Sequence, residues 1–247
     1  MDTRIRHKAL AALIVLAAAA CFGFIFWNGG QSRETHGLLT ASATTARPSR
    51  VVVIDAGHGG EDGGAVSPNG RLESAYNLEI ALKTELFLRF LGMDTAMTRT
   101  EDVSLHDDTA GTVRQRKTSD LRNRAAFVNS QDGAVLLSVH QNMFSDARYS
   151  GAQVFYNDHS DSKDLAQIMQ DALRMAIEPG NRRQPKPVDT LLMNQTQGPA
   201  ILVECGFLSN AAEEALLRDP AYQTKLAMVM SVTMTDWVVS SENKTND

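Results

Sequence analysis

Short β-branched segments alternate with longer segments of helical periodicity between residues 51 and 239, and this alternation limits the possible folds most strongly. Strands are predicted at 51–54, 94–98, 134–139, 151–156 and 200–203, and helices at 77–90, 119–128, 162–177, 211–218 and 221–239. Strands that alternate with helices form a sheet that is covered by helices on both faces. The sequence therefore predicts one α/β domain.

Three titratable residues stand where predicted strands end. His58, His140 and Glu204 each follow a short apolar strand segment. Open α/β sheets place their ligands in the crevice at the carboxyl ends of the strands. We therefore expect these three side chains to share one site.

Two histidines and a carboxylate could form a zinc site in this crevice, since a catalytic zinc takes three protein ligands and a water. The candidate histidines are His58 and His140. The candidate carboxylates are Glu61, Asp62 and Glu73. Glu61 has the His-x-x-Glu spacing from His58 that occurs in some zinc carboxypeptidases. The residues alone leave all three carboxylates open, and a histidine at a strand end often has only a structural role.

Glu204 suits a different task at the same site. Zinc lowers the pKa of a bound water to about 7. One well-placed carboxylate can then accept the proton of that water at neutral pH. Glu204 is the candidate for this general base.

The N-terminal segment predicts export across a membrane. Basic residues in segment 1–8 precede an uncharged apolar run at 9–27, which is about as long as a helix that crosses a bilayer. The positive flank keeps the N-terminus cytoplasmic. The sequence therefore predicts a cytoplasmic segment 1–8, a transmembrane signal-anchor at 9–27, and a catalytic domain on the extracytoplasmic side.

Two other fates of the leader stay open. The alanines at 17–20 offer a small-residue cleavage site, and cleavage would give a secreted protein. Cys21 could carry a lipid, but Ala18 stands where a lipobox usually has leucine. The aromatic residues of 22–27 continue the apolar stretch and suit a membrane interface, which favours the uncleaved anchor.

Composition excludes some classes of partner and completes the domain plan. The formal net charge is -5, with 24 Lys+Arg against 29 Asp+Glu, so nucleic acid is not an expected ligand. The only cysteines are Cys21 and Cys205, and no disulfide framework is expected in the domain. Residues 28–50 have the Gly, Ser, Thr and Ala content of a flexible linker, and 240–247 are predicted to be a polar tail.

Six short motifs are distributed over the domain. They are Val52-Val-Ile-Asp-Ala-Gly-His58-Gly-Gly with Asp62-Gly-Gly-Ala65, Arg71-Leu-Glu73 with Asn77-Leu78, Thr98-Arg99-Thr-Glu-Asp102, Leu121-x-x-Arg124 with Asn129, Ser138-Val-His140-Gln-Asn142, and Val203-Glu204-Cys-Gly-Phe-Leu-Ser-Asn210. In content and order they resemble the motifs of the zinc-dependent N-acetylmuramoyl-L-alanine amidases of the Amidase_3 family.

The resemblance implies a fold, a set of metal ligands and a reaction. The fold is a twisted six-stranded mixed sheet between helices. The zinc ligands carry over to His58, Glu73 and His140, and the general base carries over to Glu204. Glu61 falls at a position that the family does not use as a ligand. The implied reaction is hydrolysis of the amide between the lactyl group of N-acetylmuramic acid and the L-alanine of the peptidoglycan stem peptide.

The segments 142–156 and 118–122 resemble the sporulation amidases of the CwlD type. Such enzymes act on spore-cortex peptidoglycan during formation of muramic δ-lactam, which places the domain in the cell wall or the forespore intermembrane space. Asn142 is expected to contact the substrate. An activating protein is compatible with the family, although no sequence signal identifies one.

Three other functions stay open from the sequence. A cell-division or autolytic wall amidase would share the zinc site, but the sequence shows neither a long inhibitory helix nor a wall-binding module. A non-catalytic peptidoglycan-binding module would not need the complete set of ligands and base. A zinc carboxypeptidase would use Glu61 in place of Glu73.

Overall fold

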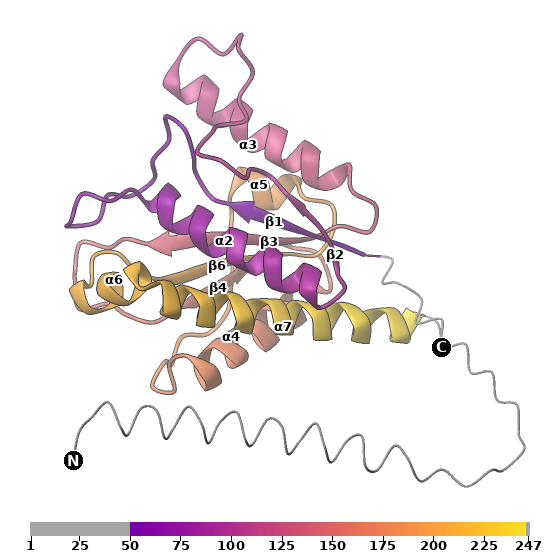
Figure 1. Ribbon diagram of the computed structural model, residues 1–247. Helices are drawn as coiled ribbons and strands as arrows, with labels where there is room; N and C mark the ends of the chain where they lie inside the picture. The colour runs from indigo at the N-terminus through magenta and orange to yellow at the C-terminus, as the bar shows by residue number, and fades with distance from the viewer. Residues whose placement is uncertain (1–49, 246–247) are drawn as a thin grey trace, which may run out of the picture. The chain divides into compact units, whose positions relative to one another are not determined.

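The computed structural model describes residues 50–245, which fold around a six-stranded sheet (Figure 1). The strand order is β2-β1-β3-β6-β4-β5. The strands are β1 (Val51–Ala56), β2 (Asp94–Met97), β3 (Val135–Asn142), β4 (Gln153–Tyr156), β5 (Lys186–Pro187) and β6 (Ala200–Phe207). β2, β1, β3 and β6 are parallel, whereas β4 is antiparallel to β6. The predicted six-stranded mixed sheet is confirmed.

Helices cover both faces of this sheet, as Figure 1 shows. One face carries α2 (Glu73–Phe90), α4 (Ser162–Ala176) and α7 (Pro220–Thr245), and the other carries α3 (Val113–Asn129) and α5 (Leu191–Gln195). Successive strand residues point to opposite faces. On β1, Val52 and Ile54 therefore join the α2 core, while Val53 joins the α3 core. α6 (Ala211–Arg218) follows β6.

The observed elements differ from the predicted ones mainly at their ends. α3 begins at Val113 rather than Ser119, because Thr112 and Gln115 form a capping box ahead of a turn with almost no apolar residues. α7 continues through 240–245, which the sequence predicts to be a polar tail. The short elements β5 and α5 were not predicted.

The predicted leader and nearly all of the linker lie outside the described residues. Within residues 50–245, no helix combines the length and the apolar character that a bilayer crossing requires. The anchor at 9–27 therefore remains a prediction.

Candidate metal centre

His58, Glu73 and His140 converge at the carboxyl edge of the parallel strands. His58 follows β1, His140 lies near the end of β3, and Glu73 is the first residue of α2. Each offers one ligand atom, and these atoms all lie within 4.8 Å of one another. The structure thus brings together the two predicted histidines and one of the three candidate carboxylates.

Glu73 occupies the centre of this cluster. Its Oε2 lies 3.3 Å from Nε2 of His58, and its Oε1 lies 3.0 Å from Nδ1 of His140. The backbone N–H groups of Ala65 and Gln141 also donate to the carboxylate. Burial alone would raise the pKa of Glu73, but the hydrogen bonds and charges of the two histidines outweigh burial and hold it far below its usual range. Glu73 is therefore an anion poised between two imidazoles.

Asp62 fixes the orientation of the His58 ring. Its Oδ2 lies 3.0 Å from Nδ1 of His58, which leaves Nε2 directed at Glu73. Burial lowers the pKa of His58, but Glu73 and Asp62 together raise it above its ordinary value. A carboxylate on the second nitrogen of a histidine selects its tautomer and increases its basicity as a ligand. Asp62 is therefore placed to orient a ligand rather than to act as one.

Two buried arginines hold the loop that carries His58. Arg99 donates to the carbonyls of Ala56 and Gly57, and Arg124 donates to the carbonyls of Ala56 and His58. His58 has a φ of 60°, a left-handed conformation that is uncommon outside glycine. The hydrogen bonds from the two arginines hold the carbonyl groups of the loop in this orientation. The backbone of the loop is thus preorganised around the cluster.

Asp55 is the buried counter-ion of Arg124. Its Oδ1 lies 2.7 Å from Nη1 of Arg124, and its Oδ2 accepts from Ser138 at 2.7 Å. Burial raises the pKa of Asp55, but Arg124, Ser138 and His140 outweigh burial and lower it to about 2. The ion pair therefore links β1, β3 and α3 directly beneath the His58 loop.

This depressed pKa predicts a loss of stability in acid. A carboxyl group whose pKa is lower in the folded state stabilises the fold above its unfolded pKa, and this contribution disappears as the pH falls through the folded pKa. Asp55 should therefore contribute about 2 kcal/mol above pH 4, most of which is lost between about pH 4 and pH 2. Urea unfolding across this range measures it.

The control for this prediction is an aspartate at the surface. Asp55→Asn should flatten the acid limb of the stability curve, whereas Asp146→Asn should change it little, because solvent screens the surface pair of Asp146 with Arg148. Equal acid limbs in wild type and Asp55→Asn would contradict the assignment.

Gly57 provides the space for the His140 ring. A Cβ atom at this position would overlap the imidazole of His140. We expect Gly57→Ala to displace that ring, to weaken metal binding, and to lower stability by about 1–3 kcal/mol through overpacking. Metal titration and thermal unfolding measure the two effects. Gly180→Ala is the matched control, because no atom lies within 4 Å of the corresponding Cβ. Unimpaired metal binding by Gly57→Ala would contradict this view of the cluster.

Glu204 lies beside the cluster on the next strand. It is the register partner of His140 across β3 and β6. Its Oε2 is buried and has no hydrogen-bond partner among the described residues. Burial and the charge of Glu73 raise the pKa of Glu204 to about 7, although His140 and His58 act in the opposite direction. A buried acceptor without a partner and with a pKa near neutrality suits proton transfer.

The cluster meets the requirements of a zinc site. Two imidazoles and a carboxylate are a known ligand set for catalytic zinc, whose bonds to nitrogen and oxygen are about 2.0–2.2 Å long. Tetrahedral ligands at such distances lie roughly 3.5 Å apart, within the observed limit of 4.8 Å. The orphaned Oε2 of Glu204, on the strand beside His140, supplies a proton acceptor near the cluster. His58, Glu73 and His140 could therefore hold a metal ion.

The other residues singled out in the sequence lie in less reactive settings. Glu61 is exposed, forms a salt bridge with Arg116 and is not part of the cluster. Asn142 ends β3, where its carbonyl accepts from the N–H of Leu208. Cys205 is a free, fully buried thiol whose pKa is raised by burial. None of these positions adds a ligand to the cluster.

In the sequence the two arginines stand only as parts of motifs, and the motifs do not predict their role. Arg99 and Arg124 are almost completely buried, at 3% and 1% exposure. A buried arginine requires acceptors, and here they are Asp55, Asp120 and the carbonyls of the His58 loop. On α3, Arg124 shares the buried face with Asp120, Ala125 and Val128, and its i,i+4 spacing from Asp120 is the sequence signal that could have indicated this.

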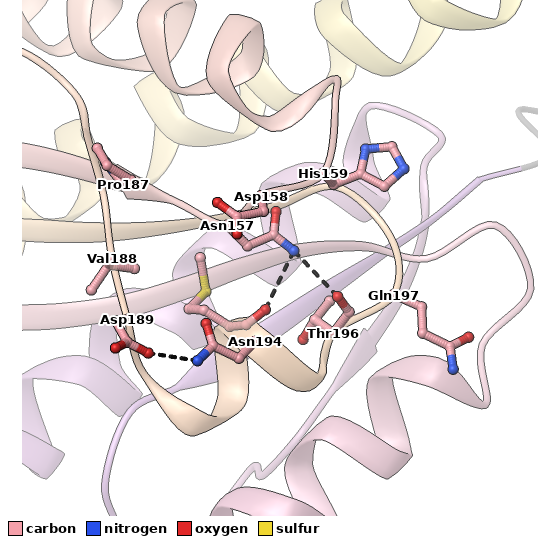
Figure 2. Close-up of a pocket in the computed structure, with 10 residues that line it drawn as sticks. Asn157, Asp158, His159, Pro187, Val188, Asp189, Asn194, Thr196 and Gln197 are labelled. Atoms are coloured by element: carbon pink, nitrogen blue, oxygen red, sulfur yellow. Dashed lines mark hydrogen bonds between the residues drawn. The ribbon is translucent and has the colours of Figure 1, made fainter.

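A separate cavity of about 500 Å³, drawn in Figure 2, is lined by Asn157, Thr196 and Gln197 near the start of β6. The side-chain amide of Asn157 in the cavity wall already donates to the carbonyls of Met193, Thr196 and Gly198. This amide is therefore not free to bind a ligand. The N–H of Asn157 pairs with Ala200 at the start of β6, whereas Glu204 lies further along that strand. The cavity is therefore distinct from the metal cluster.

Comparisons with known proteins match the region that holds the cluster. A family model described as N-acetylmuramoyl-L-alanine amidase (Amidase_3) matches residues 52–235. The germination-specific N-acetylmuramoyl-L-alanine amidase of Bacillus subtilis (strain 168) is 35% identical over 179 residues, which are 72% of this chain and 75% of that relative.

Two solved structures share the fold. The CwlD amidase from Clostridioides difficile, solved in complex with the GerS lipoprotein, matches with a TM-score of 0.74 and 34% identity, over 77% of this chain and 98% of that one. An N-acetylmuramoyl-L-alanine amidase from Clostridium difficile 630 matches with a TM-score of 0.69 and 28% identity, over 78% of this chain and 98% of that one.

Proposed function

This chain belongs to the Amidase_3 family of N-acetylmuramoyl-L-alanine amidases and is of the CwlD type, and we propose that it is a zinc-dependent peptidoglycan amidase. Its substrate is the amide between the lactyl group of N-acetylmuramic acid and the L-alanine of the stem peptide. The observation that carries this proposal is the convergence of His58, Glu73 and His140 beside the unpartnered carboxylate oxygen of Glu204.

Different residues of the chain have different roles in hydrolysis. Zinc held by the cluster would supply a Lewis acid that activates water and polarises the scissile carbonyl. Glu204 accepts a proton from the attacking water and delivers it to the leaving amino group of L-alanine. Asp62 holds the ring of His58 in place. Arg99 and Arg124 keep the loop backbone fixed, so little reorganisation accompanies the reaction.

We place the reaction in spore-cortex maturation, where removal of the stem peptide precedes muramic δ-lactam formation. The germination-specific relative supports this assignment. The CwlD structure contains a lipoprotein partner, and we propose by analogy that an activating protein acts on this chain.

We further propose that residues 9–27 anchor the chain in a membrane, with the amidase domain on the extracytoplasmic side. The uncharged apolar run and its basic flank support this location. Substrate chemistry requires it as well, because peptidoglycan lies outside the cytoplasmic membrane.

Mass spectrometry of the fragments released from purified peptidoglycan tests the activity. We expect intact stem peptides that begin with a free L-alanine amine, together with glycan strands that have lost them. Chelation should stop the release, and added zinc should restore it. Removal of C-terminal residues from stems that stay attached would indicate a carboxypeptidase, and binding without any cleavage would indicate a wall-binding module.

A further inference from the structure

Arg183 lies on the same side of the sheet as Glu204, one strand further from the metal cluster. Gln153 on β4 is the register partner of Glu204 on β6, so the two side chains project from the same face. Nη1 of Arg183 donates to Oε1 of Gln153 at 2.9 Å. The sheet order therefore places His140, Glu204 and the Gln153–Arg183 pair in sequence across the crevice.

The guanidinium of Arg183 is held firmly but only by neutral groups. Its Nε donates to the carbonyl of Ser150 at 2.8 Å, and its Cζ lies 4.6 Å from the ring centroid of Phe207 and 5.9 Å from that of Tyr149. The Tyr149 and Phe207 rings are themselves stacked, with centroids 6.2 Å apart. The cation is thereby fixed on an aromatic platform.

No carboxylate among residues 50–245 forms a salt bridge with this arginine. Arg183 lines a cavity of about 780 Å³ together with Glu178 and Glu213. Both carboxylates accept backbone N–H groups instead of pairing with Arg183. Glu213 takes those of Gly151 and Phe207, and Glu178 takes that of Ala152. Nη2 of Arg183 has no hydrogen-bond acceptor in the described part of the chain. A half-buried guanidinium with a free donor edge is suited to bind a carboxylate.

The direction of the leaving peptide follows from the position of Glu204. If the proposed function is correct, Glu204 returns a proton to the amine of L-alanine, so the peptide departs on the side of Glu204 that faces away from the metal. A free α-carboxylate on the second stem residue lies about 6 Å from that amine. Neighbouring strands are about 4.8 Å apart. A carboxylate about 6 Å from an amine beside Glu204 on β6 can therefore reach the neighbouring strand β4.

We propose that Arg183 binds the free α-carboxylate of the second stem residue and makes this amidase selective for stems in which that carboxylate is not amidated. This inference rests on the proposed function and specifies its substrate. Arg183 acts in substrate binding and does not take part in proton transfer.

The test compares two soluble, uncrosslinked glycan strands that differ in one group. One carries L-alanyl-D-glutamate stems, and the other carries L-alanyl-D-isoglutamine stems, in which the α-carboxylate is an amide. The zinc-loaded full-length chain should cleave the acid form with a kcat/KM roughly 10- to 100-fold higher, the range expected for a charge-assisted hydrogen bond. Arg183→Gln should lower kcat/KM for the acid form to the level of the amide form, mainly through KM.

Two further variants separate binding from structure. Arg183→Lys keeps the charge but loses the planar fork, and should recover part of the preference. Arg122→Gln removes an exposed charge on α3, outside this cavity, and should keep the full preference. A structural role of Arg183 would lower activity on both strands equally, and that result overturns the proposal, as does a wild-type enzyme without preference. Absence of cleavage of either strand by wild type would instead contradict the amidase function itself.

Discussion

Replacement of Glu204 by glutamine should lower kcat by about 10²- to 10⁴-fold while zinc stays bound, the range typical for loss of a general base. Glutamine keeps the size of the side chain but cannot accept a proton from water. Glu204 is not within the group of ligand atoms formed by His58, Glu73 and His140, so its replacement leaves the metal cluster complete. Steady-state cleavage of peptidoglycan and zinc analysis of the same preparation measure both effects.

Glu61→Gln is the matched control for this experiment. Glu61 is a nearby carboxylate on the Gly-rich loop, but it is exposed and paired with Arg116. Its replacement should change activity little. The assignment of the base is wrong if Glu204→Gln retains wild-type turnover, or if activity falls only because zinc is lost.

Arg124→Met should lower the free energy of unfolding by about 3–5 kcal/mol, because removal of one partner leaves Asp55 as an uncompensated buried charge. Typical domains have a total stability of about 5–15 kcal/mol, so the effect is large. The variant also removes the donor to the carbonyl of His58. We therefore expect weaker zinc binding as well. Urea unfolding and zinc titration check the two effects.

The control lies on the same helix. Arg122 is exposed, so Arg122→Met should change stability by less than about 0.5 kcal/mol. Adding Asp55→Asn to Arg124→Met should restore part of the loss, because the buried charge is then removed as well. Equal stabilities for the Arg122 and Arg124 variants would show that the buried pair does not support the loop.

The sequence predicts the location of the site because two of its residues, His58 and His140, stand at the ends of predicted strands. His58 and His140 follow segments whose β-branched residues identify them as strands, and the parallel order of those strands brings the two imidazoles to one edge. Glu204 follows by the same argument. Glu73 could not be found in this way, because it begins a helix and its approach depends on the path of the loop at 59–72. Only the family resemblance distinguished Glu73 from Glu61.

The remaining surroundings of the site depend on packing that has no periodic signal. Arg124 binds Asp55 across the helix–sheet interface, and no sequence pattern predicts that these two residues pair. Arg183 lies in a loop stretch between α4 and the short strand β5, a region where the sequence predicts no element. The sequence predicts a start of α3 at Ser119, six residues after the observed start at Val113, because the first turn is polar and only its capping box marks it.

The zinc content of purified variants tests the metal cluster most directly. Wild type should bind one zinc ion per chain, and His58→Ala, Glu73→Ala and His140→Ala should each bind much less, while Glu61→Ala retains the full amount. Full zinc content in Glu73→Ala together with loss of zinc in Glu61→Ala would contradict the cluster and with it the proposed amidase chemistry.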